Sequence, residues 1–151
     1  MTKNWIRAIS AGAASLAIVA ATGAPSPAQT PAQPLKERLV GHWRLVSVDV
    51  GGLKPFGTDP QGSMFFDGGG HYSVVVVGGA NAIAYFGEYA VDEATGAATM
   101  RVDASTRHSA AGRDERRLLT LDGDRLTVRN DRPPGSPGAV ALTWERADQP
   151  P

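Results

Sequence analysis

The chain has 151 residues, the size of a single domain, and its 15 basic and 15 acidic side chains leave it formally neutral. That balance argues against a nucleic-acid-binding protein, which usually carries a basic excess or a basic face. The sequence contains no cysteine, so it offers no disulfide, no thiolate nucleophile and no cysteine-based zinc site. Its 18 glycines and 11 prolines favour a fold with frequent turns over a helical bundle.

The first segment, residues 1–28, has the three-part layout of a secretory signal peptide. Lys3 and Arg7 form a positive start, an uncharged run covers residues 8–24, and small residues precede the expected cleavage site after Ala28. The alternative is a transmembrane anchor, but a span needs about 20 predominantly apolar residues and this run is shorter and diluted by polar ones. The sequence therefore predicts a periplasmic or secreted protein with no stable membrane anchor after cleavage.

Two short segments flank the predicted folded domain of residues 39–146. Residues 29–38 predict a linker, since residues 29–34 are rich in proline and glutamine, and Leu35–Leu39 could form a single helical turn that leads into the first strand. Residues 147–151 predict a disordered tail.

Within the domain, alternating and β-branched runs predict strands, and no long stretch has helical periodicity. Aspartate- and glycine-rich turns at residues 67–70, 92–96 and 122–124 predict hairpins. The expected strands are Val40–Val50, Ser63–Phe66, His71–Val77, Ile83–Val91, Ala97–Ala104, Arg116–Leu121, Arg125–Asn130 and Ala139–Arg146.

Eight short strands in hairpin succession favour an all-β fold, an eight-stranded antiparallel up-and-down barrel. Closure removes the exposed edges of the sheet, and the interior of such a barrel can hold one small ligand. An open β-sandwich is the alternative topology. Alternation places Trp43, Leu45 and Ser47 on the inner face of the first strand, while Arg117 and Arg146 share faces with large apolar residues.

Five sequence blocks in order carry a resemblance to a known family: LVGHWRLVSVDV, PFGTDPQGSMFFDGGGHYSV, YFGEYAVDEATG, RRLLTLDGDRLTV and LTWER. Together they cover residues 39–146 and resemble the bacterial lipocalin-like domain family; Gly41-His42-Trp43 also matches the Gly-x-Trp signature of lipocalins. The resemblance implies a closed lipocalin-like barrel with a pocket for a small, often apolar molecule, and it implies no particular reaction.

The resemblance also implies that Trp43 lies at the closed end of the barrel under an arginine from a late strand. Either Arg146 or Arg117 could supply that guanidinium, and a cation over an indole stabilises by roughly 0.5–2 kcal/mol. We expect Gly41, Trp43, Trp144 and Arg146 to have structural roles in closing the barrel.

Three tyrosines are candidate ligand-binding residues. Tyr85 and Tyr89 share one strand face with Gly87 between them, and Tyr72 lies on a neighbouring strand. A glycine within a strand marks the close approach of a ligand or of another backbone. Tyrosine offers an apolar ring and one hydroxyl, which suits a pocket for a partly polar molecule. We expect these tyrosines and Arg117 to converge in the open half of the barrel, with ordinary barrel packing as the alternative.

Other polar residues are weaker candidates. Arg101 and Asp103 share one strand face; an inward pair could orient a ligand, whereas an outward pair is a solvated face. His42, His71 and His108 lack metal-ligand spacing, so we expect surface imidazoles. Haem ligation by His71 or His108 is the alternative.

The leading hypothesis is non-catalytic binding or carriage of a small hydrophobic or amphipathic molecule. The sequence has no nucleophile elbow and no phosphate-binding loop, so it predicts no catalytic residue, no metal and no cofactor. An enzyme of the isomerase or cyclase type on the same scaffold is one alternative, and an interaction module with a solid barrel is another. The predicted ligand-binding residues are Tyr72, Tyr85, Tyr89, Arg101 and Arg117.

Overall fold

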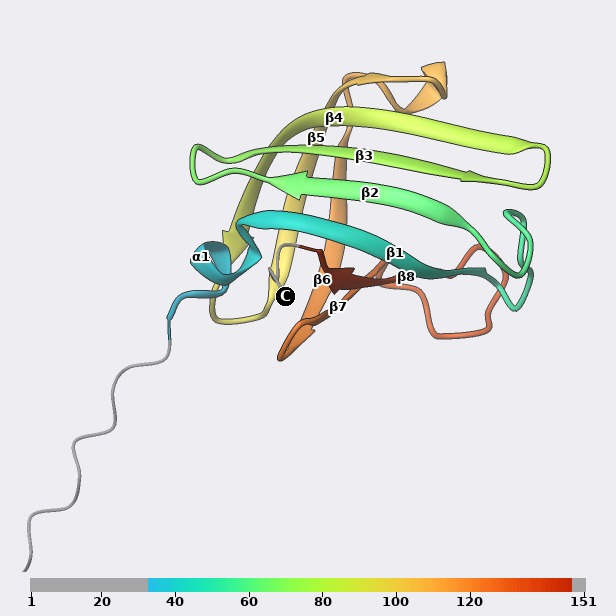
Figure 1. The fold of residues 1–151 in the computed structure, drawn as a ribbon. Coiled ribbons are helices and arrows are strands. Elements are labelled where there is room, and N and C mark those ends of the chain that lie inside the picture. Colours follow the sequence, from blue (N-terminus) through green and yellow to red (C-terminus); the bar gives the residue numbers. More distant parts are fainter. Residues whose placement is uncertain (1–32, 148–151) are drawn as a thin grey trace, which may run out of the picture. The chain divides into compact units, whose positions relative to one another are not determined.

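The computed structural model describes residues 33–147, so the predicted signal peptide, the start of the linker and the last four residues lie outside the described part. One short helix, α1 (Leu35–Leu39), precedes eight strands that form a closed antiparallel barrel (Figure 1). The strands are β1 (Gly41–Val50), β2 (Gln61–Phe66), β3 (His71–Gly78), β4 (Asn81–Asp92), β5 (Ala97–Ser105), β6 (Asp114–Asp122), β7 (Arg125–Arg129) and β8 (Val140–Arg146).

Each strand pairs with the next one in the chain, and β8 pairs with β1 to close the barrel. The predicted eight-stranded up-and-down barrel is thereby confirmed, and the open sandwich is excluded. A single 3-10 turn, η1 (His108–Ala110), lies in the connection between β5 and β6.

Alternation along β3 shows how the sequence specifies the inner face. Val74 and Val76 are buried in the barrel, whereas Val75 and Val77 are exposed on its outer surface. β-branched side chains suit the pleated surface on either side, so four consecutive valines form a regular strand. The interior therefore receives every second residue of the run.

A β-bulge in β1 changes the face of one residue. The pairing of β1 with β8 shifts between Leu45 and Ser47. A bulge inserts an extra residue into one strand, which reverses the inward and outward alternation beyond it. Val48 is therefore buried and Ser47 is exposed, so the prediction that Ser47 faces the interior is wrong.

A second bulge lies between β4 and β5, where the pairing shifts between Phe86 and Gly87. A Cβ built on Gly87 would lie 1.9 Å from the carbonyl oxygen of Arg101. Any side chain at position 87 would therefore overlap the neighbouring backbone. The close approach that a glycine in this strand predicted is made by the backbone of β5.

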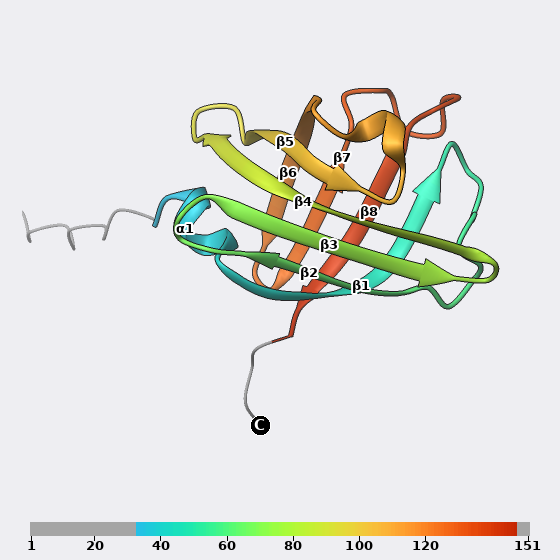
Figure 2. The ribbon, with the colours of Figure 1, turned by 90° about the horizontal axis from the view of Figure 1, so that it is seen from above.

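Helix α1 covers one end of the barrel, next to the β2–β3 and β4–β5 turns (Figures 1 and 2). The carboxylate of Glu93, in the β4–β5 turn, accepts hydrogen bonds from the backbone N–H groups of Leu35 at 2.6 Å and Lys36 at 2.9 Å. Those amides have no partner within the helix, so Glu93 satisfies them from a distant turn. Leu39, at the end of α1, is fully buried.

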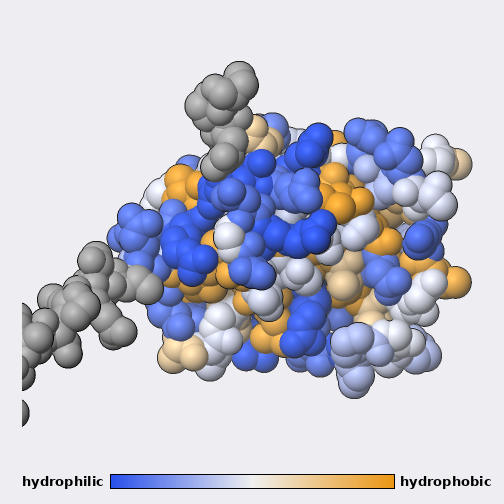
Figure 3. Space-filling view, turned by 60° about the horizontal axis from the view of Figure 1, so that its bottom comes forward, coloured by the Kyte–Doolittle hydropathy of each residue, from blue (hydrophilic) through white to orange (hydrophobic). Residues whose placement is uncertain are grey.

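The other end of the barrel carries the loops that join β1 to β2, β3 to β4, β5 to β6 and β7 to β8 (Figure 2). On the outside, the face in Figure 3 mixes hydrophilic and hydrophobic residues. The outer faces of β2, β3 and β4 expose Phe65, Val75, Val77 and Phe86. Among residues 33–147, no helix has the length and apolar character needed to traverse a bilayer.

Candidate functional site

A cavity of about 560 Å³ occupies the half of the barrel next to the loops. This volume lies within the range of roughly 300–1,000 Å³ that is typical of pockets for small molecules. Much of its wall is apolar and comes from the inner faces of several strands. Residues of this apolar wall include Met64, Val74, Val76, Met100, Val102 and Trp144.

The β1–β2 loop forms part of the mouth of the cavity and is held against the end of β3 and the start of β4. The Asn81 side-chain amide donates a hydrogen bond to the carbonyl oxygen of Pro55 at 2.6 Å. A Cβ on Gly78 would lie 2.2 Å from the carbonyl oxygen of Phe56, so this position admits only glycine. Phe56 lines the cavity and packs against the core.

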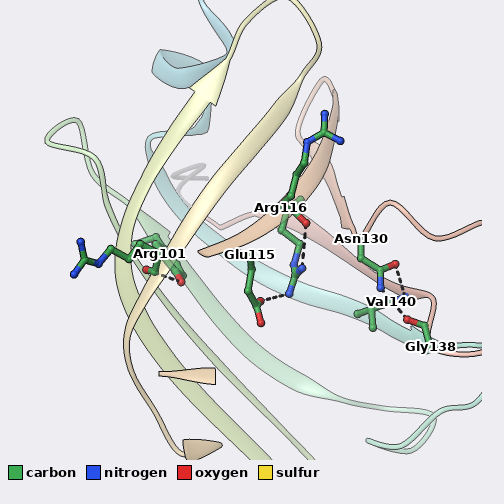
Figure 4. A network of polar contacts seen from close by, with 8 residues as sticks. Arg101, Glu115, Arg116, Asn130, Gly138 and Val140 are labelled. Atoms are coloured by element: carbon green, nitrogen blue, oxygen red, sulfur yellow. Dashed lines mark hydrogen bonds and ion pairs between the residues drawn. The ribbon is translucent and has the colours of Figure 1, made fainter. Parts of the chain in front are cut away.

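The polar part of the wall comes from β6. Glu115 and Arg117 both line the cavity and form an ion pair, with their side chains 31% and 21% exposed. Arg117 also donates a hydrogen bond to the carbonyl oxygen of Arg116 at 3.2 Å. In Figure 4, the side chains of Glu115 and Arg116 point to opposite sides of the strand, as alternation requires.

Glu115 lines the cavity but is not among the ligand-binding residues predicted from the sequence. The predicted strand began at Arg116, whereas β6 begins at Asp114. Residues two apart in a strand lie on the same face, so Glu115, two residues before the inward-facing Arg117, also faces inward. The alternation that placed Arg117 could therefore have identified Glu115, had the strand been extended.

Tyr85 on β4 lies in the same region of the cavity wall. Its ring centroid is 6.0 Å from that of Tyr72 in an edge-to-face arrangement. Within the described residues its hydroxyl has no hydrogen-bond partner. Burial raises the pKa of Tyr85 to about 12, with Arg117 and Arg107 lowering it and Glu115 raising it. The phenol is therefore protonated and able to donate at neutral pH.

Tyr72 and Tyr89 do not line the cavity, although both are buried. The Tyr72 hydroxyl donates to the carbonyl oxygen of Arg101 at 3.3 Å, and the Tyr89 hydroxyl donates to that of Asp67 at 2.9 Å. The Tyr89 ring lies 4.8 Å from Phe66 and beneath the ammonium group of Lys36. These two tyrosines therefore connect the cavity to the helix-covered end.

Arg101 lies on the outer face of β5. Its side chain is 63% exposed, and its Nε lies 3.6 Å from a carboxylate oxygen of Asp103. Figure 4 shows the guanidinium pointing away from Glu115. The structure therefore supports the solvated-face alternative for this pair. Of the five predicted ligand-binding residues, it brings Tyr85 and Arg117 to the cavity wall.

The end covered by α1 is built around Trp43. Its indole N–H donates to the carbonyl oxygen of Leu39 at 2.8 Å. The guanidinium of Arg146 lies 4.3 Å from the centre of the indole ring. It also donates to the carbonyl oxygens of Val40 at 3.0 Å and Arg38 at 2.5 Å. Of the two arginines that the resemblance left open, Arg146 is the one that covers Trp43.

Gly41 and Trp144 are the other two residues that were predicted to close the barrel, and Trp144 lies in the cavity wall instead of at the end covered by α1. Gly41 begins β1 with a φ of 130°, a conformation that favours glycine. Trp144 is 1% exposed and lies in the cavity wall, nearer the mouth along β8 than Arg146. Within the described part of the chain, its buried indole N–H has no hydrogen-bond partner.

The histidines lie outside the cavity lining. His42 stacks on Phe65 with ring centroids 4.2 Å apart, and His71 contacts the carboxylate of Asp67 at 2.9 Å. Hydrogen bonds from the backbone N–H and the imidazole of His71 lower the pKa of Asp67. His108 is exposed in η1. Residues 33–147 contain no group of three or more side chains placed to hold a metal ion.

No protein-family model matches this chain, and neither does any curated protein. The closed barrel is compatible with the lipocalin-like resemblance of the sequence, which remains a resemblance. The functional assignment accordingly depends on the cavity and on the side chains that line it.

Proposed function

We propose that this protein is an exported, lipocalin-like binding protein that holds a small hydrophobic or amphipathic molecule inside its barrel. The observation that carries the proposal is the cavity of about 560 Å³ between the inner faces of the strands. Apolar walls with a few convergent polar groups are typical of small-molecule sites.

The cavity and its lining also favour ligand binding over the two alternative functions, an interaction module with a solid barrel and an enzyme. A solid barrel that acts through its outer surface does not need an interior volume of this size. General acid–base catalysis most often uses a histidine or a carboxylate that is free to exchange a proton, and Tyr85 suits it less because burial raises its pKa to about 12. Glu115 is the one acidic side chain among the described residues that line the cavity, no histidine lines it, and Arg117 already holds Glu115 in an ion pair. Binding without catalysis is therefore the better supported function.

A neutral apolar fluorophore, N-phenyl-1-naphthylamine, tests whether the cavity binds ligand. We expect saturable binding of one fluorophore per chain, with enhanced emission as the dye leaves water. Val76 lines the cavity and its neighbour Val75 is exposed, so Val76→Phe and Val75→Phe form a matched pair. Val76→Phe should weaken binding at least tenfold by filling the cavity, and Val75→Phe should leave it unchanged. Absence of saturable binding, or equal effects of the two variants with folding intact by circular dichroism, would contradict the proposal.

Export is the second part of the proposal and rests on residues 1–28, which lie outside the described residues. The charged start, apolar run and small-residue site favour cleavage after Ala28. Sequencing of the secreted or periplasmic protein should therefore begin at or near Gln29. Recovery of the protein in a membrane fraction with Met1 retained would show that the segment acts as an anchor.

A further inference from the structure

We infer that the cavity selects apolar molecules carrying a compact anionic group, such as a carboxylate, which binds at the wall formed by Arg117, Tyr85 and Arg107. This inference rests on the proposed binding function and adds the charge of the ligand to it. The apolar part of the molecule would lie against the opposite, uncharged wall.

The first argument is the charge of the lining. The charged side chains among the described lining residues are Glu115, Arg117 and Arg107, which leaves an excess of one positive charge. Glu115 balances Arg117 within their ion pair. Arg107 lies exposed at the mouth, and its guanidinium has no ion pair within the described part of the chain. An anion entering the cavity would thus meet two guanidinium groups and one carboxylate.

The second argument is the balance of hydrogen-bond donors and acceptors. A guanidinium has several N–H donors and no acceptor, and those of Arg117 are used in part by Glu115 and by the Arg116 carbonyl oxygen. The Tyr85 hydroxyl lacks a partner within the described residues, so it adds a free donor. The one anionic acceptor, Glu115, is already engaged. A ligand that brings its own acceptor therefore completes this wall, and charge-assisted hydrogen bonds are the strong ones.

The third argument is the location of these polar groups. Glu115 and Arg117 come from β6 and Tyr85 from β4, while Trp144 comes from β8, on the other side of the barrel from β4. Val48 from β1 and Met64 from β2 are buried lining residues on the same side as Trp144. The cavity thus has a polar side and an apolar side, which matches an amphipathic molecule and not a uniformly apolar one.

Three probes of equal chain length test the inference: decanoate, decanol and decylamine, each used to displace N-phenyl-1-naphthylamine at neutral pH. We expect decanoate to bind about tenfold more tightly than decanol, because a hydrogen bond to a charged group adds about that factor. Decylamine should bind most weakly, since its ammonium group meets the excess positive charge. Equal displacement by all three would overturn the inference while leaving the proposed binding function intact.

Three variants on one strand locate the effect. Arg117→Gln should weaken decanoate binding about tenfold and decanol binding much less, because the decanol hydroxyl carries no charge. Glu115→Gln should strengthen decanoate binding, because it removes the competing carboxylate and frees the guanidinium. Arg116→Gln makes the same charge change on the exposed side of β6 and should have no effect. If Arg116→Gln weakens decanoate binding as much as Arg117→Gln does, the anion responds to overall charge and the inferred site is wrong.

If the neutral fluorophore and decanol both fail to bind, the proposed function itself fails. If they bind and Glu115→Gln lowers the affinity for decanoate, the ion pair recognises the ligand in some other way and the inference fails alone. The two failures are therefore distinguishable in one set of titrations.

Discussion

The two buried tryptophans of the barrel lie in contrasting surroundings. Trp43, at the end covered by α1, has its indole N–H bonded to the Leu39 carbonyl oxygen and its ring covered by Arg146. Trp144, in the cavity wall, has a buried N–H with no partner in the described part of the chain. At the covered end, the indole N–H thus has a hydrogen-bond partner within the protein, whereas the other end contains an unpaired polar group beside the cavity.

This difference separates residues that hold the fold from residues that can serve a ligand. At the covered end, the hydroxyl of Tyr89 and the guanidinium of Arg146 bind backbone carbonyl oxygens. In the cavity half, the Tyr85 hydroxyl and the Trp144 indole N–H have no partner among the described residues, and both residues line the cavity. Buried polar groups without a protein partner are unusual, so the cavity half is the part of the barrel to which the proposed ligand is assigned.

The largest effect should come from truncating the residue at the centre of the covered end. Trp43→Ala removes a fully buried ring, its hydrogen bond and its contact with Arg146, and should lower the free energy of unfolding by about 3–5 kcal/mol. Urea unfolding followed by far-UV circular dichroism measures this change. A loss below about 1 kcal/mol would show that Trp43 is not central to the core.

A milder exchange compares the two tryptophans directly. Trp43→Phe leaves the Leu39 carbonyl oxygen unpaired, so it should cost about 1–3 kcal/mol more than Trp144→Phe, which removes a donor that has no partner. The same unfolding experiment applies to both variants. Equal losses would show that the hydrogen bond and the covering guanidinium contribute little, and that area alone determines stability.

High pH should weaken the fold through its tyrosines. Burial raises the pKa of Tyr72, Tyr85 and Tyr89, to about 12 for Tyr85. Because the unfolded chain loses these protons at about pH 10, the stabilisation is fully present below pH 10 and is lost as the pH rises towards the folded-state pKa. Absorbance at the tyrosinate band should therefore be weaker at pH 10 in the folded protein than in urea. Half-ionisation of the folded protein at pH 10 would contradict this burial.

The smallest effect should come from the turn that holds α1. Glu93→Gln weakens two hydrogen bonds to the first amides of the helix and should cost about 0.5–1 kcal/mol, as the loss of a helix cap does. Glu88→Gln, an equal charge change at an exposed position of β4, is the matched control and should cost less. Equal costs for the two variants would mean that the helix is held by the packing of Leu39 alone.

Much of the fold is readable from local sequence patterns. Alternating β-branched runs and aspartate–glycine turns predicted every strand, with ends displaced by no more than a few residues, because side-chain alternation and turn chemistry are local properties. The same alternation placed Trp43 and Arg117 inside the barrel. It failed at Ser47, where the bulge depends on the pairing of β1 with β8, a contact between opposite ends of the domain sequence.

The sequence by itself determined the strands, their order and the inner face of most of them. The tertiary structure decided how far along the barrel each side chain lies. It placed Tyr85 in the cavity wall and Tyr89 at the end covered by α1, although both share one face of β4. It also decided that Arg146 covers Trp43 and that Glu115 joins Arg117. Alternation fixes the direction in which a side chain points, whereas its position along the barrel depends on the stagger and tilt of all eight strands, which non-local hydrogen bonding sets.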